Sequence, residues 1–191
     1  MHCKRIKGIG LLDILVVVFL LGIVAAIVVP RFMNLHSDAH RANNQGTAAA
    51  ISAGITLLQS KAQHKGYDRP LTFQMGEEDY VILFTSDGWP QGIGQSRTNY
   101  MLFEQSELGD AACKLFFEVI MQGNETSVIT RNDYRKNGER ADYMAMGFRG
   151  RVYDGCRYIY TDAQPEKGKV YVVKYDPNGG NVTVETGDMP R

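Results

Sequence analysis

The sequence lacks the motifs that mark common catalytic and redox chemistry. It contains no Gly-x-Ser-x-Gly nucleophile turn and no Cys-x-x-Cys pair. The short segment Gly92–Gly94 lacks the third glycine of a phosphate-binding loop. Internal repeats and low-complexity tracts are also missing. We therefore expect neither an enzymatic activity nor a cofactor.

An excess of basic charge is absent as well. The 191 residues carry 21 Lys and Arg against 21 Asp and Glu, and several of the cations lie before Gly8. Without that leading segment the chain would have a net charge near −3. Binding to nucleic acid requires a basic face, so we expect no nucleic-acid partner.

What the sequence does contain is a long apolar run near its N-terminus. Ile9–Val29 is almost wholly apolar and holds one acid, Asp13. As a helix this run spans about 32 Å, enough to cross a bilayer. Basic residues precede the run and none lies within it, which predicts that the chain after Pro30 is exported. A carboxylate within lipid is costly and usually functional, so Asp13 is a candidate site residue; the alternative is a solvated position near the membrane surface.

Cysteine is scarce. Cys3 precedes the apolar run, whereas Cys113 and Cys156 follow it. On the exported side oxidation is permitted, so we expect Cys113 and Cys156 to form a disulfide. Two free buried thiols are the alternative.

A second helix signal follows the apolar run. From Phe32 to about Lys65 no proline occurs, and small or apolar residues recur every three or four positions. We expect one long helix that includes the apolar run and is kinked near Pro30. Because the stripe consists mostly of small residues, something should pack closely against it, and half of the long helix should lie in lipid or against partners. The stripe comprises Phe32, Leu35, Ala39, Ala42, Gly46, Ala49, Ala53, Leu57 and Ser60.

The remaining sequence predicts an α+β head with mainly antiparallel strands. Gly66–Gly76 is expected to be a connection, and Ser86–Gly92 and Gly123–Arg140 are expected to be turns or loops. Ser106–Met121 should form a helix with Ser106 as its N-cap. Asp176–Asn181 has the composition of a calcium loop, but a hairpin turn fits it better. The strand candidates are Tyr80–Thr85, Ser127–Thr130, Tyr143–Phe148, Arg157–Thr161, Val170–Tyr175 and Asn181–Thr186.

Three residues before the head could supply metal ligands. His36 and His40 share one helix face, with Asp38 between them. No third ligand has a suitable spacing, because His64 is too far along the same helix. We expect a solvated face and no metal site.

Several tyrosines could line a carbohydrate-binding surface. Alternating aromatic residues in strands more often form cores and cross-strand pairs, so core positions are expected for most of them. These residues are Tyr153, Tyr158, Tyr160, Tyr171 and Tyr175.

The segment Lys7–Val17 reads Lys-Gly-Ile-Gly-Leu-Leu-Asp-Ile-Leu-Val-Val and resembles the cleavage motif of type IV prepilins. In that alignment Gly8 is the last leader residue and Ile9 is the mature N-terminus. Gly22 and Pro30 also fall where type IVa pilins have a glycine and a proline, and they are the expected helix-kink positions.

The segment Val29–Ala39 looks like the mannose-sensitive haemagglutinin (MSHA) group of pilins, and so does the placing of Cys113 and Cys156. The family usually has Glu at the position of Asp13 and Thr at the position of Gly10. The resemblance is strongest over about the first forty residues.

The resemblance implies a type IV pilin fold: a long N-terminal helix, transmembrane in one half and amphipathic in the other, packed on an antiparallel sheet. Residues 1–8 would be the leader, 9–30 the transmembrane and assembly helix, 31–65 the amphipathic half and 66–191 the head. A prepilin peptidase would cleave after Gly8 and methylate the amine of Ile9. Asp13 of one subunit would then neutralise the terminal amine of its neighbour.

The implied function is structural. Subunits would wait as single-pass proteins in the bacterial inner membrane, with the C-terminus in the periplasm. Assembly machinery would then polymerise them into an MSHA-like surface pilus for attachment and biofilm formation. One alternative is a pseudopilin of a type II secretion system. Another is a signal-anchored periplasmic binding domain, in which the head alone would cover the small-residue stripe.

Overall fold

The computed structural model describes residues 10–66, 69–96, 98–123, 125–162 and 168–189, and it describes no side chains between residues 29 and 37. The predicted cleavage residues Gly8 and Ile9 lie outside these ranges. The chain divides into two compact units, Met1–His40 and Arg41–Arg191. Each unit is described by itself below.

The helix α1 (Leu11–Lys65) begins in the first unit and ends in the second. The helix continues without a break through Gly22 and Pro30, so the predicted long helix is confirmed. A kink at these two positions stays a prediction. The last turn of α1 contains the basic residues His64 and Lys65. Basic residues stabilise the C-terminal end of a helix because they interact favourably with the helix dipole.

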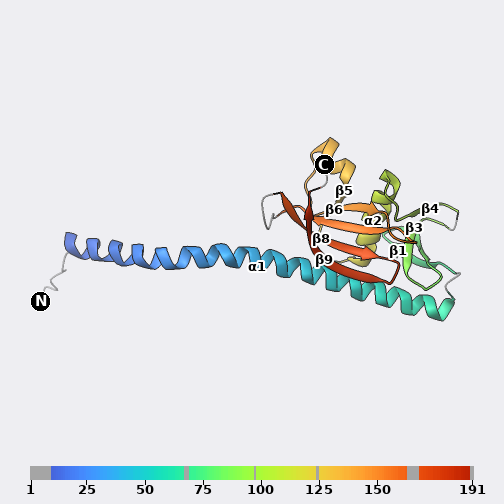
Figure 1. Cartoon of the computed structure of the whole chain (residues 1–191), viewed down its shortest axis with the longest axis horizontal. Helices are drawn as coiled ribbons and strands as arrows, with labels where there is room; N and C mark the ends of the chain where they lie inside the picture. The colour runs from blue at the N-terminus through green and yellow to red at the C-terminus, as the bar shows by residue number, and fades with distance from the viewer. Residues whose placement is uncertain (1–9, 67–68, 97, 124, 163–167, 190–191) are drawn as a thin grey trace, which may run out of the picture. The chain divides into compact units, whose positions relative to one another are not determined.

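The second unit is an α+β head, as predicted (Figure 1). Its second helix is α2 (Glu107–Ile120), and η1 (Asp133–Asn137) is a short π-helical turn. The predicted N-cap is confirmed, because the Ser106 hydroxyl accepts the Gly109 N–H at 3.0 Å. The described strands are β1 (Leu71–Met75), β2 (Glu78–Phe84), β3 (Pro90–Gly94), β4 (Tyr100–Leu102), β5 (Val128–Thr130), β6 (Tyr143–Phe148), β7 (Gly155–Tyr160), β8 (Lys169–Asp176) and β9 (Asn181–Asp188).

The strands form two sheets rather than one. A four-stranded sheet has the order β1-β2-β3-β4, and a five-stranded sheet has the order β5-β6-β7-β8-β9. Every neighbouring pair is antiparallel except β5 and β6, which are parallel. The β8–β9 hairpin matches the predicted turn, with Gly180 at a positive φ of 68°.

Two predicted connections proved to contain strands. Gly66–Gly76 holds β1, and the predicted turn Ser86–Gly92 gives way to β3 at Pro90. The strand β4 was not predicted, and η1 occupies part of the predicted loop Gly123–Arg140. The sequence of β3 contains a proline and two glycines and carries little strand propensity, and β4 is only three residues long. Antiparallel pairing with β2 and with each other holds them.

The head has one main core between the two sheets and the two helices. Aromatic residues fill its centre, where Phe117 lies 4.9 Å from Tyr158 and Phe116 lies 5.8 Å from Tyr175, ring centroid to centroid. From α1, the core takes Ile51, Ile55, Leu58 and Ala62, among others. A smaller cluster on the other face of the five-stranded sheet contains Met144, Met146, Ile159, Val170 and Val172.

The head does not cover the small-residue stripe of α1. The members of the stripe from Ala42 to Ser60 are exposed, and Leu57 is 58% exposed. The residues that are buried lie two positions further along, which is about 200° around a helix of ~3.6 residues per turn. The head packs on the larger side chains of Ile51 and Ile55, and close packing of something else against the stripe stays a prediction.

Candidate assembly site

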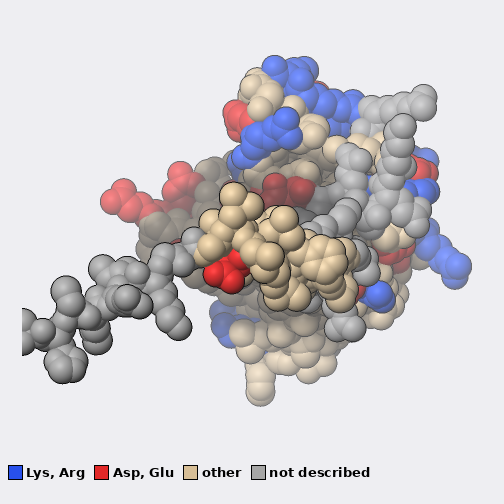
Figure 2. All heavy atoms as spheres, turned by 90° about the vertical axis from the view of Figure 1, so that its left-hand side faces the viewer, with Lys and Arg blue, Asp and Glu red and all other residues tan. Residues whose placement is uncertain are grey.

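The first unit presents an uncovered apolar surface. Leu11–Val28 is long and apolar enough to cross a membrane, and none of it is buried within the chain. Its large side chains, from Leu11 at 84% to Val28 at 39%, are all exposed. An apolar surface of this extent is a site for lipid or for a partner. Figure 2 shows the segment nearly end on, as a tan surface with a red carboxylate in it.

Asp13 lies in the first turn of this helix. Its Oδ2 accepts the backbone N–H of Gly10 at 3.1 Å, so an acid three residues into the helix satisfies a donor that the helix leaves unpaired. Negative charge also suits the positive end of the helix dipole. The bond uses one carboxylate oxygen, and Oδ1 can still accept a second donor.

The second unit exposes a further helix surface. We call it the small-residue face. It lies on the side of α1 opposite the head core, and nothing lies within 4 Å of a Cβ atom built on Gly46. Small residues allow two helices to approach closely. The small-residue face comprises Ala42, Gly46, Ala49, Ala53, Leu57 and Ser60.

A buried polar contact fixes which face of α1 points toward the head. Asn44 and Thr47 are 0% and 6% exposed. The Tyr143 hydroxyl donates to Asn44 Oδ1 at 3.0 Å and lies 3.1 Å from Thr47 Oγ1. Burial raises the pKa of Tyr143 to about 12. Rotating the helix would break both of these buried hydrogen bonds, so the contact holds the small-residue face outward. This contact was not predicted from the sequence. The available signal was the presence of polar residues, Asn44 and Thr47, among the regularly spaced apolar residues of α1.

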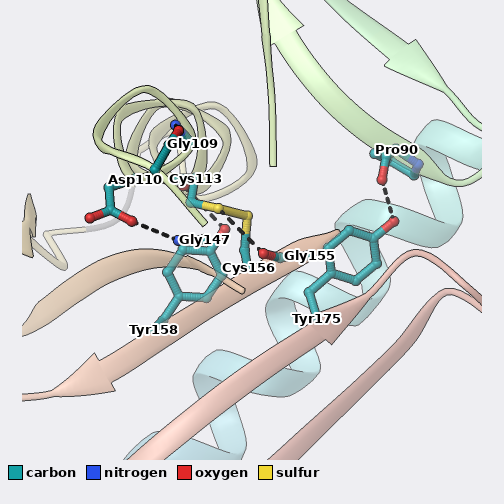
Figure 3. The surroundings of a disulfide bond; sticks show 10 residues. Pro90, Gly109, Asp110, Cys113, Gly147, Gly155, Cys156, Tyr158 and Tyr175 are labelled. Carbon is teal, nitrogen blue, oxygen red and sulfur yellow. Dashed lines mark hydrogen bonds between the residues drawn. A yellow bond between two sulfur atoms is a disulfide. The ribbon is translucent and has the colours of Figure 1, made fainter. Parts of the chain in front are cut away.

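The predicted disulfide is confirmed. Cys113 of α2 and Cys156 of β7 are bonded, and both are fully buried. Figure 3 shows the Tyr158 hydroxyl pointing to the carbonyl of Cys113, to which it donates at 3.1 Å. The bridge and this bond attach α2 to the five-stranded sheet beside the core.

Asp110 makes a second attachment between α2 and that sheet. Its Oδ1 accepts the Gly147 N–H at 2.8 Å, and its Oδ2 lies 3.2 Å from Arg131. Burial raises the pKa of this carboxyl, and the Gly147 N–H and Arg131 oppose the shift without cancelling it. The group is a structural link rather than an exposed acid.

The tyrosine prediction is confirmed for the four strand residues. Tyr158, Tyr160, Tyr171 and Tyr175 are all buried in the core. Tyr153 is partly exposed in the loop before β7, where its hydroxyl lies 3.4 Å from that of Ser86. The strand tyrosines therefore cannot form a carbohydrate-binding surface.

The hollow beside Tyr153 is held together by its own hydrogen bonds. Asn178 Oδ1 accepts the N–H groups of Val152 and Tyr153, both at 2.9 Å. Asn178 Nδ2 donates to the carbonyl of Tyr153 at 2.8 Å and also to Asp176. This amide joins the β8–β9 turn to the loop before β7, so the Asp176–Asn181 segment serves as a hairpin turn.

The proposed metal ligands are only partly described. Among the residues that the structure covers, no three His, Cys, Asp or Glu side chains gather as a metal site requires. The side chain of His36 lies outside the described part.

Comparison with known proteins gives a partial match. No protein-family model matches the chain, and no solved structure matches it. The type IV narrow pilus major component PilA5 of Thermus thermophilus is 37% identical to it over 59 residues. The match covers 31% of this chain and 51% of that relative, so the chain spans about half the length of the curated relative that it matches.

Proposed function

We propose that this chain is a structural subunit of a type IV pilus and that it polymerises through its N-terminal helix. The observation that carries the proposal is the exposed apolar segment Leu11–Val28, whose only charged residue is Asp13. The similarity to PilA5 supports it, since that protein is named as a major component of a type IV pilus. PilA5 is a structural component rather than an enzyme, in agreement with the expected absence of enzymatic activity.

The physical basis of assembly follows from the two exposed helix surfaces. Moving an apolar helix from lipid into a bundle of similar helices gains little hydrophobic energy, because both surroundings are apolar. Close van der Waals packing therefore has to supply the attraction, and small residues permit it. The small-residue face lies beyond that apolar segment and offers close packing between the amphipathic halves of neighbouring helices, whereas a signal-anchored binding domain would be expected to cover it with its own head.

We propose that a prepilin peptidase cleaves after Gly8 and methylates the new amine of Ile9. Cleavage creates a cation at Ile9, four residues before Asp13. In a filament, Asp13 Oδ1 of one subunit would accept a hydrogen bond from the amine of its neighbour while Oδ2 keeps the Gly10 N–H. Such a pair offsets the desolvation of both charges and sets the register between subunits.

The proposal extends to location and role. Before assembly the subunit would lie in the inner membrane, with its head in the periplasm, and afterwards it would lie in a surface pilus. Residues 1–8, 9–30, 31–65 and 66–191 would be the leader, the assembly helix, the amphipathic half and the head. The resemblance of Val29–Ala39 to MSHA pilins supports an MSHA-like pilus for attachment and biofilm formation.

Intact-mass and N-terminal analysis of the native protein tests the processing. The expected chain begins at methylated Ile9, lacks two hydrogens because of its disulfide, and is recovered from sheared surface filaments. Recovery of the processed chain from the membrane alone would point to a pseudopilin. A chain that still begins at Met1 would refute the pilus proposal and leave a signal-anchored domain.

A substitution tests the role of the acid. Asp13→Ala should leave the membrane level unchanged but reduce incorporation into filaments. Asp38→Ala is the matched control, because Asp38 is an exposed acid outside the apolar segment. Normal incorporation of Asp13→Ala would remove the charge-pairing role.

A further inference from the structure

Two cations lie directly opposite each other on the five-stranded sheet. Arg157 of β7 is paired with Lys174 of β8 in the antiparallel register. Both side chains lie over the ring of Phe148, at 4.8 and 4.5 Å from its centroid. Like charges in this arrangement repel, and attraction of both cations to the same aromatic ring offsets part of that repulsion.

Neither cation has an acidic partner within the described chain. The four ion pairs there use other cations. The basic residues near η1 differ in this respect, because Arg131 is paired with Asp110 and Lys136 lies 4.0 Å from Glu107. The Arg157–Lys174 pair is therefore a positive site without an acidic partner among the described residues.

The tip of the β1–β2 hairpin has the opposite charge. Glu77 lies in the turn, and Glu78 and Asp79 open β2, all three exposed. Glu78 accepts the hydroxyl hydrogen bond of Tyr80. Glu77 and Asp79 form no ion pair among the described residues. We call these two residues the acidic tip.

We propose that the acidic tip of one copy binds the Arg157–Lys174 pair of a second copy. The inference rests on the proposed pilus function and names a contact between heads within the filament. The two surfaces differ, so the contact is head-to-tail and can repeat along a filament instead of closing a dimer. A second copy is favoured over a polyanion because the chain without its leader would have a net charge near −3, which disfavours a polyanion, and because the chain supplies both halves of the contact itself.

Charge reversal tests the pairing in the full-length chain. Arg157→Glu with Lys174→Glu should lower filament recovery about tenfold, because it opposes like charges across the contact. Glu77→Lys with Asp79→Lys should do the same. Combining all four substitutions should restore recovery to within about twofold of the wild type. Recovery that stays normal in both double variants, or fails to return in the fourfold variant, would overturn the proposal.

Two controls separate charge pairing from misfolding. Arg69→Glu with Arg140→Glu makes the same change of charge at two exposed cations elsewhere in the head that form no ion pair among the described residues, and it should leave recovery unchanged. Protease resistance of the head reports whether each variant folds. As a direct measurement, Glu77→Cys with Lys174→Cys should produce a ladder of cross-linked subunits in sheared filaments, and a missing ladder would refute the contact.

Failure of the pilus function itself is distinguishable. If the wild type never enters filaments, the proposed function fails, and self-association of the detergent-solubilised full chain becomes the readout. Association that weakens with salt and in each double variant, and returns in the fourfold variant, would support the contact; its absence would overturn it. Normal assembly combined with lost binding of filaments to heparin would overturn it too, in favour of a polyanionic ligand.

Discussion

Removal of the Cys113–Cys156 bridge should lower the free energy of unfolding by about 4 kcal/mol. The bridge joins residues 43 apart in sequence, and the chain-entropy model gives about 4 kcal/mol for a loop of that size. Alanine is the suitable replacement at both positions. Serine would bury a hydroxyl where each cysteine is fully buried, adding roughly 1–3 kcal/mol if the hydroxyl found no partner.

Urea unfolding of the full chain in detergent measures this effect. Trp89 is the single tryptophan and packs against the head core, so its fluorescence reports unfolding of the head. With an m-value of about 2 kcal/mol/M, the midpoint should fall by roughly 2 M in the double alanine variant. The wild type unfolded in the presence of a reductant should also show a midpoint lowered by roughly 2 M, because reduction opens the same loop.

Two results would refute this reasoning. One is a loss of less than about 1 kcal/mol, which would mean that the unfolded chain is already constrained or that the bridge strains the native state. The other is rapid reaction of the native protein with a thiol reagent after mild reduction, since both sulfur atoms should be protected by burial. The single variant Cys156→Ala separates loss of the bridge from loss of both side chains.

Three further predictions concern buried groups and the faces of α1. Tyr143→Phe should lower the free energy of unfolding by about 1–3 kcal/mol, because it removes a hydroxyl that is hydrogen-bonded to two buried polar side chains; chemical denaturation measures it. Asp110→Asn should become more destabilising as pH falls in pH-dependent urea unfolding, because the raised pKa of the wild-type carboxyl means that the folded state gains protons, and stability, as pH decreases. A pH-independent difference would contradict it. Gly46→Ala should stabilise the isolated subunit by about 0.5–1 kcal/mol, whereas Gly54→Ala should destabilise it, because its Cβ would lie 2.7 Å from Ile120 Cγ2; thermal unfolding of both compares the two faces.

Local signals in the sequence were sufficient for several elements. The helix Glu107–Ile120 was predictable because Ser106 is a strong N-cap and the apolar residues follow helical spacing. The β8–β9 hairpin was predictable because Asn and Gly suit its turn. The apolar N-terminal run with its single acid, Asp13, needed no tertiary information, since hydropathy is a property of consecutive residues.

The short strands were not predictable in this way. Gly92 and Gly94 in β3 have no side chains, and a Cβ at either would lie within 3 Å of the backbone of β4. From the sequence alone, these glycines indicate a turn. They lie in a strand because close approach of β4 requires them, and that approach exists only in the folded head.

The sequence by itself determined that this chain has an apolar N-terminal helix, a following helix and a disulfide-linked α+β head. Tertiary structure decided which face of α1 is buried, because small and large apolar residues both follow a helical period, and only the shape of the core selects Ile51 and Ile55. It also decided that Arg157 and Lys174 stand opposite each other, since strand register places residues that are distant in sequence side by side. Features that depend on residues adjacent in the chain could be predicted from the sequence. Features that depend on packing between distant segments could not.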